Sequence, residues 1–485
     1  MKQFLVILCL ILSFLSLGRE AIALAYVGEF KPSANEGRIN KFGIHILELS
    51  DLDKAEELVN SAGGDWGWVT VVIRDNDLNQ EKWQDFMDQC RERHLIPIVR
   101  VATHTEGTYW VKPNPQDSQK WAGFLSSLNW PTADQYIVLF NEPNHANEWG
   151  GEVNPKEYAR ILSDYSEKLK VKNEKFKILN GGLDLAAPNG KETMDAYTFL
   201  QQMKQEVPDI FERLDGWCSH SYPNYGFVGK PWDTGRISIR GYDWELWVLK
   251  NHFGLQKDLP VFITETGWPT GAKYEMRNTK SGQRPVAVEK YYDETTAAQY
   301  LKTAFENVWL NDSRVAAVTP FVLNYPSELF AAFSWFNQAG EPAPQYDLIK
   351  SIPKESWWPS QIDRYEVKSI LLPSFLPTNT IYQGKVIIKN AGQAIWGEKG
   401  VITIPATSSG NLNISGLVFT FPNKVRPGEV AQLEFTLQSS SESGEFEFTW
   451  GDLPKQKMKV LPSSVLTAAR YSLWEKLLLK IKEVF

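Results

Sequence analysis

The sequence has little cysteine and no excess of basic residues, and its N-terminal apolar run is short. Three cysteines among 485 residues exclude a disulfide framework. A formal net charge of -7 argues against a nucleic-acid-binding protein, because such proteins present a basic face. The apolar stretch at residues 4–17 is too short for an ordinary membrane-spanning helix. We therefore expect a globular protein in which Cys90 and Cys218 are buried free thiols.

The N-terminus has the pattern of an export signal. Lys2 opens a short basic region, residues 4–17 are apolar, and Ala21-Ile22-Ala23 supplies the small residues of a cleavage site. Cys9 lies inside the apolar stretch and not at its end, which argues against a lipoprotein anchor. We predict a signal peptide of residues 1–23, cut after Ala23, and an exported protein that is extracellular or associated with the cell envelope.

Short apolar segments alternate with helical patterns over residues 24–358. Eight apolar segments can be counted there, at residues 43–46, 69–73, 96–102, 136–140, 177–182, 216–220, 261–264 and 316–323. The helical patterns include residues 52–62, 81–94, 155–170, 294–310 and 344–351. Alternation at this spacing implies a parallel sheet, and eight units over about 330 residues imply an α/β fold closed into a (β/α)8 TIM barrel.

The character of the sequence changes near Trp357-Trp358-Pro359. Residues 365–462 contain short strand-like runs separated by Pro, Gly, Asn and Ser, which is typical of a small all-β sandwich. The runs are residues 367–371, 384–389, 401–404, 417–421, 430–437 and 445–450. This region resembles immunoglobulin-like modules in a loose pattern that consists of Asn390-Ala391-Gly392, Trp396, Pro427-Gly428 and Trp450.

Residues 463–485 form a last segment whose apolar residues recur at helical spacing. The apolar positions are Leu466, Ala469, Leu473, Trp474, Leu477, Leu478, Ile481 and Phe485. Basic residues outnumber acidic ones at the other positions. Two interpretations of this amphipathic helical tail stay open. It docks on the sandwich or the barrel, or it makes contact with a membrane surface.

Two of the apolar segments end alike, in a polar residue followed by a glutamate. Residues 137–140 run into Asn141-Glu142-Pro143, and residues 261–263 run into Thr264-Glu265-Thr266. Residues just past buried parallel strands lie at the carboxyl edge, where barrels build their active sites. A lone glutamate there would be explained by a surface salt bridge or a helix N-terminal charge. A pair could flank one glycosidic bond, as glycoside hydrolysis requires.

These strings resemble the clan-A glycoside hydrolases, the retaining β-glycosidases built on a (β/α)8 barrel. In that clan the acid/base follows an asparagine at the end of the fourth strand, and the nucleophile ends the seventh. Glu142 and Glu265 match those positions. Residues 259–270 are similar to the nucleophile signature of family 17, the β-1,3-glucanases, whereas residues 141–145 are more similar to clan members that act on other β-glycosides.

The resemblance also implies roles for neighbours of the pair. Asn141 matches an asparagine that hydrogen-bonds the sugar 2-hydroxyl, and Arg74 matches an arginine that keeps the nucleophile ionised. Tyr222 matches a tyrosine that hydrogen-bonds the nucleophile, and His220 would line the sugar site. The alternatives are a turn former for Asn141 and a salt bridge to a neighbouring aspartate for Arg74.

Other candidates follow predicted strands at the same rim. His45 and His104 lie there without a His-x-His or His-Glu-x-x-His spacing, so we favour a sugar-binding rim and expect neither a metal nor another cofactor. Asp184 binds a sugar hydroxyl or caps a loop. A pyranose presents a flat C–H face to an aromatic ring, and Trp268 is the best candidate for stacking, followed by Trp335, whose alternative is core packing.

The pair of glutamates predicts a double displacement. Glu142 would protonate the leaving oxygen while Glu265 attacks the anomeric carbon, and carboxyl groups about 5 to 5.5 Å apart would retain the β configuration. We predict an exported, monomeric, retaining glycosidase that hydrolyses O-glycosyl bonds of a β-linked polysaccharide or oligosaccharide. The alternatives are a transglycosylase on the same barrel and a non-catalytic glycan-binding protein of the envelope.

Overall fold

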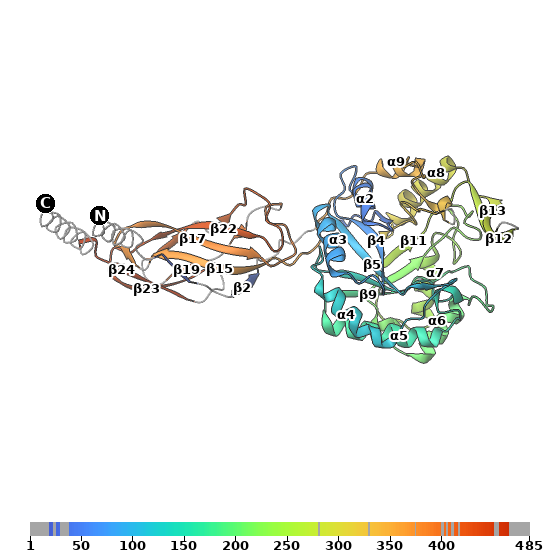
Figure 1. The fold of residues 1–485 in the computed structure, drawn as a ribbon, viewed down its shortest axis with the longest axis horizontal. Coiled ribbons are helices and arrows are strands. Elements are labelled where there is room, and N and C mark those ends of the chain that lie inside the picture. Colours follow the sequence, from blue (N-terminus) through green and yellow to red (C-terminus); the bar gives the residue numbers. More distant parts are fainter. Residues whose placement is uncertain are drawn as a thin grey trace. The chain divides into compact units, whose positions relative to one another are not determined.

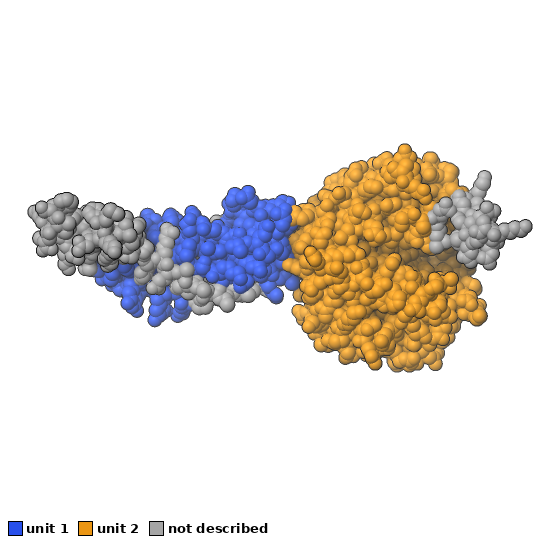
Figure 2. Space-filling model, viewed as in Figure 1, with its two compact units in different colours: residues 1–33, 361–485 blue, residues 34–360 orange. Residues whose placement is uncertain are grey.

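The computed structural model divides into two compact units (Figures 1 and 2). The barrel unit is Ala34–Ser360, and the sheet unit combines Met1–Ser33 with Gln361–Phe485. The structure describes residues 19–22, 26–29, 38–279, 282–327, 330–373, 375–398, 402–403, 406–408, 412–415, 418–450 and 455–464. None of the helices within these ranges is long and apolar enough to cross a membrane.

Eight parallel strands of the barrel unit form a closed ring (Figure 1). In order they are β3 (Gly43–His45), β4 (Gly67–Arg74), β5 (Leu95–Ala102), β8 (Gln135–Leu139), β9 (Phe176–Asn180), β10 (Trp217–His220), β11 (Val261–Glu265) and β14 (Val315–Val318). Parallel bridges from Leu179 to Gly216 and from Phe42 to Val318 join the two hydrogen-bonded parts of the ring. The predicted (β/α)8 barrel is confirmed, and each predicted strand overlaps an observed one.

Helices follow the strands and bury their apolar faces against the ring. They are α2 (Leu52–Val59), α3 (Gln80–Glu92), α4 (Ser118–Ser127), α5 (Pro155–Lys172), α6 (Ala196–Glu206), α7 (Gly241–Asn251), α8 (Glu294–Ala304) and α9 (Pro344–Lys350). Side chains that accept a backbone N–H cap α3, α5 and α8, namely Asn79, Asn154 and Asp293. The predicted helix of residues 294–310 is divided into α8 and a π-helical segment, Phe305–Trp309.

The interior of the ring changes from apolar to polar toward its carboxyl edge. The apolar part includes Trp68, Ile96, Ile98, Val138, Leu179, Cys218, Phe262 and Ala317. Successive side chains of a strand point to opposite faces, so the next inward positions lie two residues later. The hydroxyls of Thr70 and Thr319, at two of these positions, lie 2.7 Å apart. Cys218 and, in α3, Cys90 are buried free thiols, as predicted.

Tryptophans close the amino end of the ring. Nε1 of Trp357 donates to the carbonyl of Trp66 at 3.0 Å, and the ring centroids of Trp66 and Trp358 lie 5.4 Å apart. The change in the character of the sequence at Trp357 thus falls close to Ser360, the last residue of the barrel unit.

Two hairpins lie in loops that follow barrel strands. β6 (Thr105–Glu106) pairs with β7 (Tyr109–Trp110) after β5, and β12 (Ala272–Thr279) pairs with β13 (Gly282–Lys290) after β11. Because loops that follow strands lie at the carboxyl edge of a barrel, these hairpins border the end of the ring that carries both glutamates.

The sheet unit has two main sheets around one apolar core. One consists of β1 (Arg19–Ile22), β2 (Tyr26–Glu29), β15 (Arg364–Pro373), β17 (Ile381–Asn390), β20 (Asn413–Ser415) and β22 (Val430–Gln438). The other consists of β16 (Phe375–Pro377), β19 (Ala406–Ser408), β23 (Gly444–Trp450) and β24 (Gln456–Leu461), while β18 (Ile402–Thr403) pairs with β21 (Val418–Phe419). The core joins Val367 and Val386 of the first sheet to Phe448 and Met458 of the second. The predicted all-β region after the barrel is confirmed at this level.

Two predictions fall largely outside the described residues. Of the predicted signal peptide, residues 1–23, the structure describes β1, which pairs with β15 with Arg19 opposite Pro373. Cleavage after Ala23 would remove β1 and leave β2 on β15, and it stays a prediction. Of the predicted tail, residues 463–485, the structure describes residues 463–464.

Candidate active site

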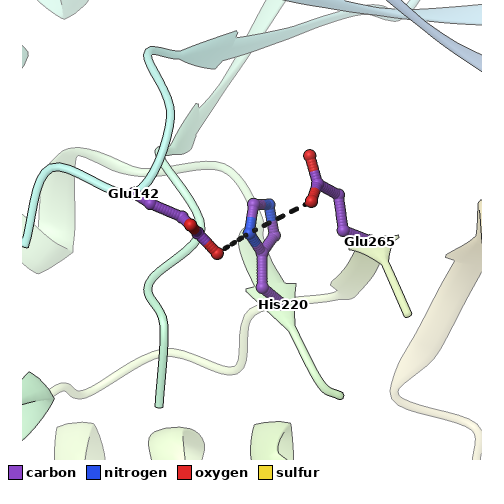
Figure 3. Close-up of side chains that lie close together, drawn as sticks. All are labelled: Glu142, His220 and Glu265. Atoms are coloured by element: carbon purple, nitrogen blue, oxygen red, sulfur yellow. Dashed lines mark hydrogen bonds and ion pairs between the residues drawn. The ribbon is translucent and has the colours of Figure 1, made fainter. Parts of the chain in front are cut away.

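Glu142 and Glu265 meet at the carboxyl edge of the ring, with His220 between them (Figure 3). Glu265 is the last residue of β11, and Glu142 lies just past the end of β8. Nδ1 of His220 lies 2.9 Å from Oε1 of Glu142 and 3.8 Å from Oε2 of Glu265. One oxygen of each carboxylate and a ring nitrogen all lie within 4.8 Å of one another. The two glutamates predicted from separate strand ends share one site.

The carboxylate of Glu265 is buried and accepts two hydrogen bonds. Nη1 of Arg100 donates to Oε1 at 2.6 Å, and the Tyr222 hydroxyl donates to Oε2 at 3.1 Å. Burial alone would raise the pKa of Glu265, but the charges of His220 and Arg100 outweigh burial and hold this pKa well below its usual range. Glu265 is therefore an anion at neutral pH, and Tyr222 contacts it where the sequence predicted.

The arginine beside Glu265 is Arg100 of β5 and not the predicted Arg74. Nη1 of Arg100 reaches both Oε1 of Glu265 and Oδ1 of Asn141, each at 2.6 Å. Arg74 is exposed at the end of β4, and its guanidinium lies 5.5 Å from the ring centroid of Trp110. The prediction for Arg74 is corrected, because the end of β4 directs its side chain to another part of the rim.

The sequence does contain a signal for Arg100. A strand presents the same face at every second residue, and Ile96 and Ile98 of β5 lie in the apolar interior of the ring. Arg100 is the next inward position, so it is a charged residue in an apolar strand, on the face that the ring encloses. Such a residue needs a buried partner of opposite charge.

The backbone around Glu142 is held in an unusual conformation. Phe140 and Glu142 have φ angles of 72° and 26°, in the left-handed region that residues other than glycine seldom adopt. Asn144 is fully buried and ties this turn to the loop after β9, because its side-chain amide donates to the carbonyl of Asp184 at 2.9 Å. Strain of this kind persists where surrounding contacts impose it, and it is concentrated at functional sites.

His220 is buried between the carboxylates, and a glycine makes room for its ring. Burial alone would lower the pKa of His220, but the charge of Glu265 and the hydrogen bond to Glu142 raise this pKa well above its usual value. A Cβ atom at Gly182 would lie 2.2 Å from Cδ2 of His220. Glycine at position 182 is therefore required by the packing of the site, and a larger residue would displace the imidazole.

A third carboxyl, absent from the predicted residues, belongs to the same site. Glu148 lies in a 3-10 segment, Ala146–Glu148, that follows Glu142. Burial raises the pKa of Glu148 to about 7 and the charge of Glu142 adds to this effect, whereas Arg100 and a hydrogen bond with Asn141 oppose it. Asn141 is thus held between Arg100 and Glu148. Nothing in the sequence marks Glu148, because its nearness depends on the turn and not on a strand end.

His104 and Asp184 lie at the rim with partners other than the two glutamates. Nδ1 of His104 lies 2.9 Å from Oδ1 of Asp75. Oδ2 of Asp184 lies 2.9 Å from Nε2 of His145. Each residue therefore forms a pair of its own around the central site, and their predicted contacts with sugar hydroxyls stay predictions.

His45 lies at the end of β3 and is fully buried. Its ring meets that of Phe321 edge to face, with 5.2 Å between the centroids. Burial lowers the pKa of His45 to about 3, and the nearby charge of Arg100 lowers it further than the charge of Glu265 raises it. The imidazole is therefore neutral at neutral pH and adds no charge to the site.

The two tryptophans predicted to stack on sugar are buried. Trp268 is 5% exposed and Trp335 is 3% exposed, and both belong to the main core of the barrel unit. Nε1 of Trp268 donates to the carbonyl of Gly229 at 2.8 Å, and its ring centroid lies 5.8 Å from that of Tyr300. Neither ring offers an open face, so the stacking prediction is corrected and core packing applies to both.

Within the described part of the chain, Glu142, His220 and Glu265 are also the one set of His, Cys, Asp or Glu side chains close enough to hold a metal ion. Arg100 donates to Glu265 and places a positive charge beside that position. Repulsion between a guanidinium and a metal cation disfavours binding there. The arrangement suits two carboxyl groups with separate acid–base and nucleophilic roles better than it suits metal coordination.

Comparisons with known proteins give distant structural likenesses. No protein-family model and no curated protein matches the sequence. A GH128 (subgroup II) endo-beta-1,3-glucanase from Sorangium cellulosum is 15% identical with a TM-score of 0.42, and the match covers 64% of this chain and 98% of that chain. A monomeric beta-xylosidase from Caulobacter crescentus CB15 is 10% identical with a TM-score of 0.44, and the match covers 85% of this chain and 98% of that chain. A glucosidase from Croceicoccus marinus is 9% identical with a TM-score of 0.45, and the match covers 87% of this chain and 100% of that chain. These TM-scores are below 0.5, so the fold rests on the strand pairing and the chemistry on the side chains described above.

Proposed function

We propose that this protein is an exported retaining β-glycoside hydrolase of the clan-A type, which acts on a β-linked polysaccharide or oligosaccharide. The observation that carries the proposal is the pairing of two carboxylates within 4.8 Å at one barrel rim, where Arg100 holds one of them as an anion. Glycoside hydrolysis needs an acid on one side of the bond and a carboxylate on the other. Glu142 and Glu265 meet that need.

In the first step of the proposed reaction, Glu265 attacks the anomeric carbon while Glu142 gives a proton to the glycosidic oxygen. The bond between that carbon and that oxygen breaks, the leaving sugar departs with the proton, and a covalent glycosyl ester forms on Glu265. Arg100 and Tyr222 each bind one oxygen of Glu265, so the carboxylate is oriented before the substrate arrives.

In the second step Glu142, now ionised, takes a proton from water, and the water oxygen attacks the anomeric carbon and releases Glu265. Nδ1 of His220 lies 2.9 Å from Oε1 of Glu142, so it can donate to that carboxylate once Glu142 is ionised. The short separation of the carboxylates supports this route over inversion, because inverting enzymes hold their carboxyl groups about 6.5–9.5 Å apart to admit a water.

The configuration of the first-formed sugar tests the proposal. A panel of β-1,3-glucan, β-1,4-glucan, xylan and galactan would identify a substrate, and proton NMR would follow the anomeric signal of the product. We expect the β-anomer to form first. An α-anomer would contradict double displacement, and products longer than the substrate would assign the transglycosylase alternative. Complete inertness toward the panel and toward aryl β-glycosides would favour the glycan-binding alternative.

Localisation, assembly and the accessory parts of the chain belong to the same proposal. The leader pattern of residues 1–23 supports export, and the apolar and basic positions of residues 463–485 support contact with a membrane surface. Residues 365–462 are proposed to be an immunoglobulin-like module, and the protein is proposed to be a monomer. Anionic vesicles should pull down the mature protein but not a version that ends at Pro462. Equal recovery of the two would assign the tail to packing within the protein.

A further inference from the structure

Trp232 presents an exposed indole in the loop between β10 and α7. Its surface is 64% exposed, and Trp247, at 53%, is the other exposed tryptophan among the described residues. The loop follows a barrel strand, so it lies at the carboxyl edge with both glutamates. Single exposed apolar residues are ordinary on protein surfaces. Trp232 differs from such residues in how its ring is held and in which residues adjoin it.

The backbone turn and a neighbouring ring fix Trp232 in place. Asp233 closes the turn, because its Oδ2 accepts the backbone N–H of Lys230 at 2.6 Å and its own N–H donates to the Lys230 carbonyl at 3.1 Å. The ring of Tyr300, in α8, meets the indole with 5.7 Å between centroids. Nζ of Lys230 donates to the hydroxyls of Tyr300 at 3.0 Å and Tyr292 at 2.6 Å. A ring held in this way loses little freedom when it binds a ligand.

The same cluster of rings reaches the strand that carries Glu265. Trp268, in the loop after β11, packs against Tyr300 with 5.8 Å between centroids. Its Nε1 donates to the carbonyl of Gly229, in the loop that carries Trp232. The exposed indole is thus connected to the catalytic strand through two ring contacts, and it belongs to the wall of the same rim.

We propose that Trp232 forms an additional subsite, at which its indole stacks on a pyranose of a β-linked glycan beyond the units that contact the glutamates. The inference rests on the proposed hydrolysis and deepens it, because such a subsite matters only for a substrate of several units. The faces of β-linked pyranoses carry C–H groups, and these suit the electron-rich face of an indole.

Trp247 provides a matched control for the test. It lies on α7 with its ring against His252, so it is an exposed tryptophan outside the cluster of Trp232, Tyr300 and Trp268. Trp232→Ala, Trp232→Phe and Trp247→Ala would be compared with the unmodified protein. The substrates are p-nitrophenyl β-glucoside, β-1,3- and β-1,4-linked gluco-oligosaccharides of increasing length, and laminarin.

Trp232→Ala should raise KM for the long chains roughly tenfold, as loss of a tryptophan anchor does at other interfaces. Its kcat/KM on the aryl glucoside should match that of the unmodified protein, Trp232→Phe should keep most of the affinity, and Trp247→Ala should be normal on every substrate. Equal KM values of the two alanine variants on long chains would overturn the subsite. An equal loss on the aryl glucoside would also overturn it, because it would assign Trp232 a general role in the fold.

Gel electrophoresis through laminarin separates this inference from the proposed hydrolysis, because it detects binding without cleavage. The unmodified protein and Trp247→Ala should be retarded, and Trp232→Ala should run faster than both. That order would support the subsite even for a protein without hydrolase activity. Equal retardation of the two variants, or no retardation of the unmodified protein by laminarin or by a soluble β-1,4-glucan, would overturn it.

Discussion

The ends of β11 and β8 carry one glutamate each and surround it differently. The side chain of Glu265 is 11% exposed and accepts from Arg100 and Tyr222, whereas that of Glu142 is 22% exposed and contacts His220. A buried carboxylate with two donors is fixed in charge and direction, whereas the carboxyl of Glu142 is more open to its surroundings and has one nitrogen neighbour. Two residues of one type thereby acquire different roles from their neighbours.

Removing the fixed anion should have the largest effect. Glu265→Ala should lower turnover roughly a thousandfold or more on every substrate, because no covalent intermediate can form. Initial rates on an aryl glycoside and on a glycan would measure this loss, and thermal unfolding would show that the variant is folded. A variant that keeps substantial activity on both substrates would show that Glu265 is not the nucleophile.

Removing the proton donor should give a loss that depends on the leaving group. Glu142→Ala should lower kcat/KM on a natural glycan roughly a hundredfold or more. It should spare the formation of the glycosyl ester from a dinitrophenyl glycoside, whose leaving group needs no proton. Burst kinetics on the two substrates would measure the difference. Losses of equal size in that first step would show that Glu142 is not the acid.

The contact of Arg100 with Glu265 is a further difference between the two glutamates, and its removal should have a smaller effect. Arg100→Met should raise the pKa of Glu265, because Arg100 is one of the charges that lower it, and the acid limb of the kcat/KM profile should move to higher pH. Activity at neutral pH should fall roughly tenfold, a typical cost of one charge-assisted hydrogen bond. Arg74→Met is the matched control and should leave the limb in place. A shift in Arg74→Met but not in Arg100→Met would return the role to Arg74.

Glu148 should affect stability more than turnover. The pKa of its carboxyl rises from 4.5 to about 7 on folding, so between these values the folded protein holds a proton that the unfolded chain has lost. Stability from this group therefore falls as pH rises from 4.5 to 7. Glu148→Gln should remove up to about 3 kcal/mol of that decline. Urea unfolding at several pH values would measure it, and an unchanged pH dependence would contradict the burial of this carboxyl.

The sheet unit supplies none of the described residues around Glu142 and Glu265, so its removal should have the smallest effect. A chain of residues 34–360, the barrel unit, should hydrolyse an aryl glycoside within about twofold of the full rate, because a unit with its own core can fold alone. Steady-state kinetics and circular dichroism would check rate and fold together. A folded but inactive chain would show that the sheet unit influences the site.

The barrel was predictable because its strands are buried on both faces. Such strands need apolar residues at successive positions, and the eight runs stand out for that reason. The sheet unit was harder. β24 alternates buried and exposed positions and could have been found by its period of two, whereas β20 spans three residues, too few for any period. Short strands of this kind are defined by their partners and not by their own sequence.

The two glutamates were predictable because a strand end locates them. The role of Arg100 could be predicted only with the register of the ring, because it depends on which face of β5 points inward. The position of Glu148 in the site could be predicted only from the conformation of the turn after β8. A sugar-stacking tryptophan must be exposed, and the identity of the residue does not show exposure. The nearness of Trp268 to Glu265 in the sequence favours it although it is buried, whereas no motif marks the exposed Trp232.

The ring closes where its first and last strands meet, and this seam joins distant parts of the chain. Phe42 bridges to Val318, and Nζ of Lys41 donates to the carbonyl of Asp312 across 271 residues. Contacts between residues so far apart form late, because closing a long loop costs chain entropy. During synthesis the edge of β3 therefore stays unpaired until β14 has left the ribosome. Nascent chains that end before Val318 present that edge to other molecules, and chaperone binding should decline once the seam has closed.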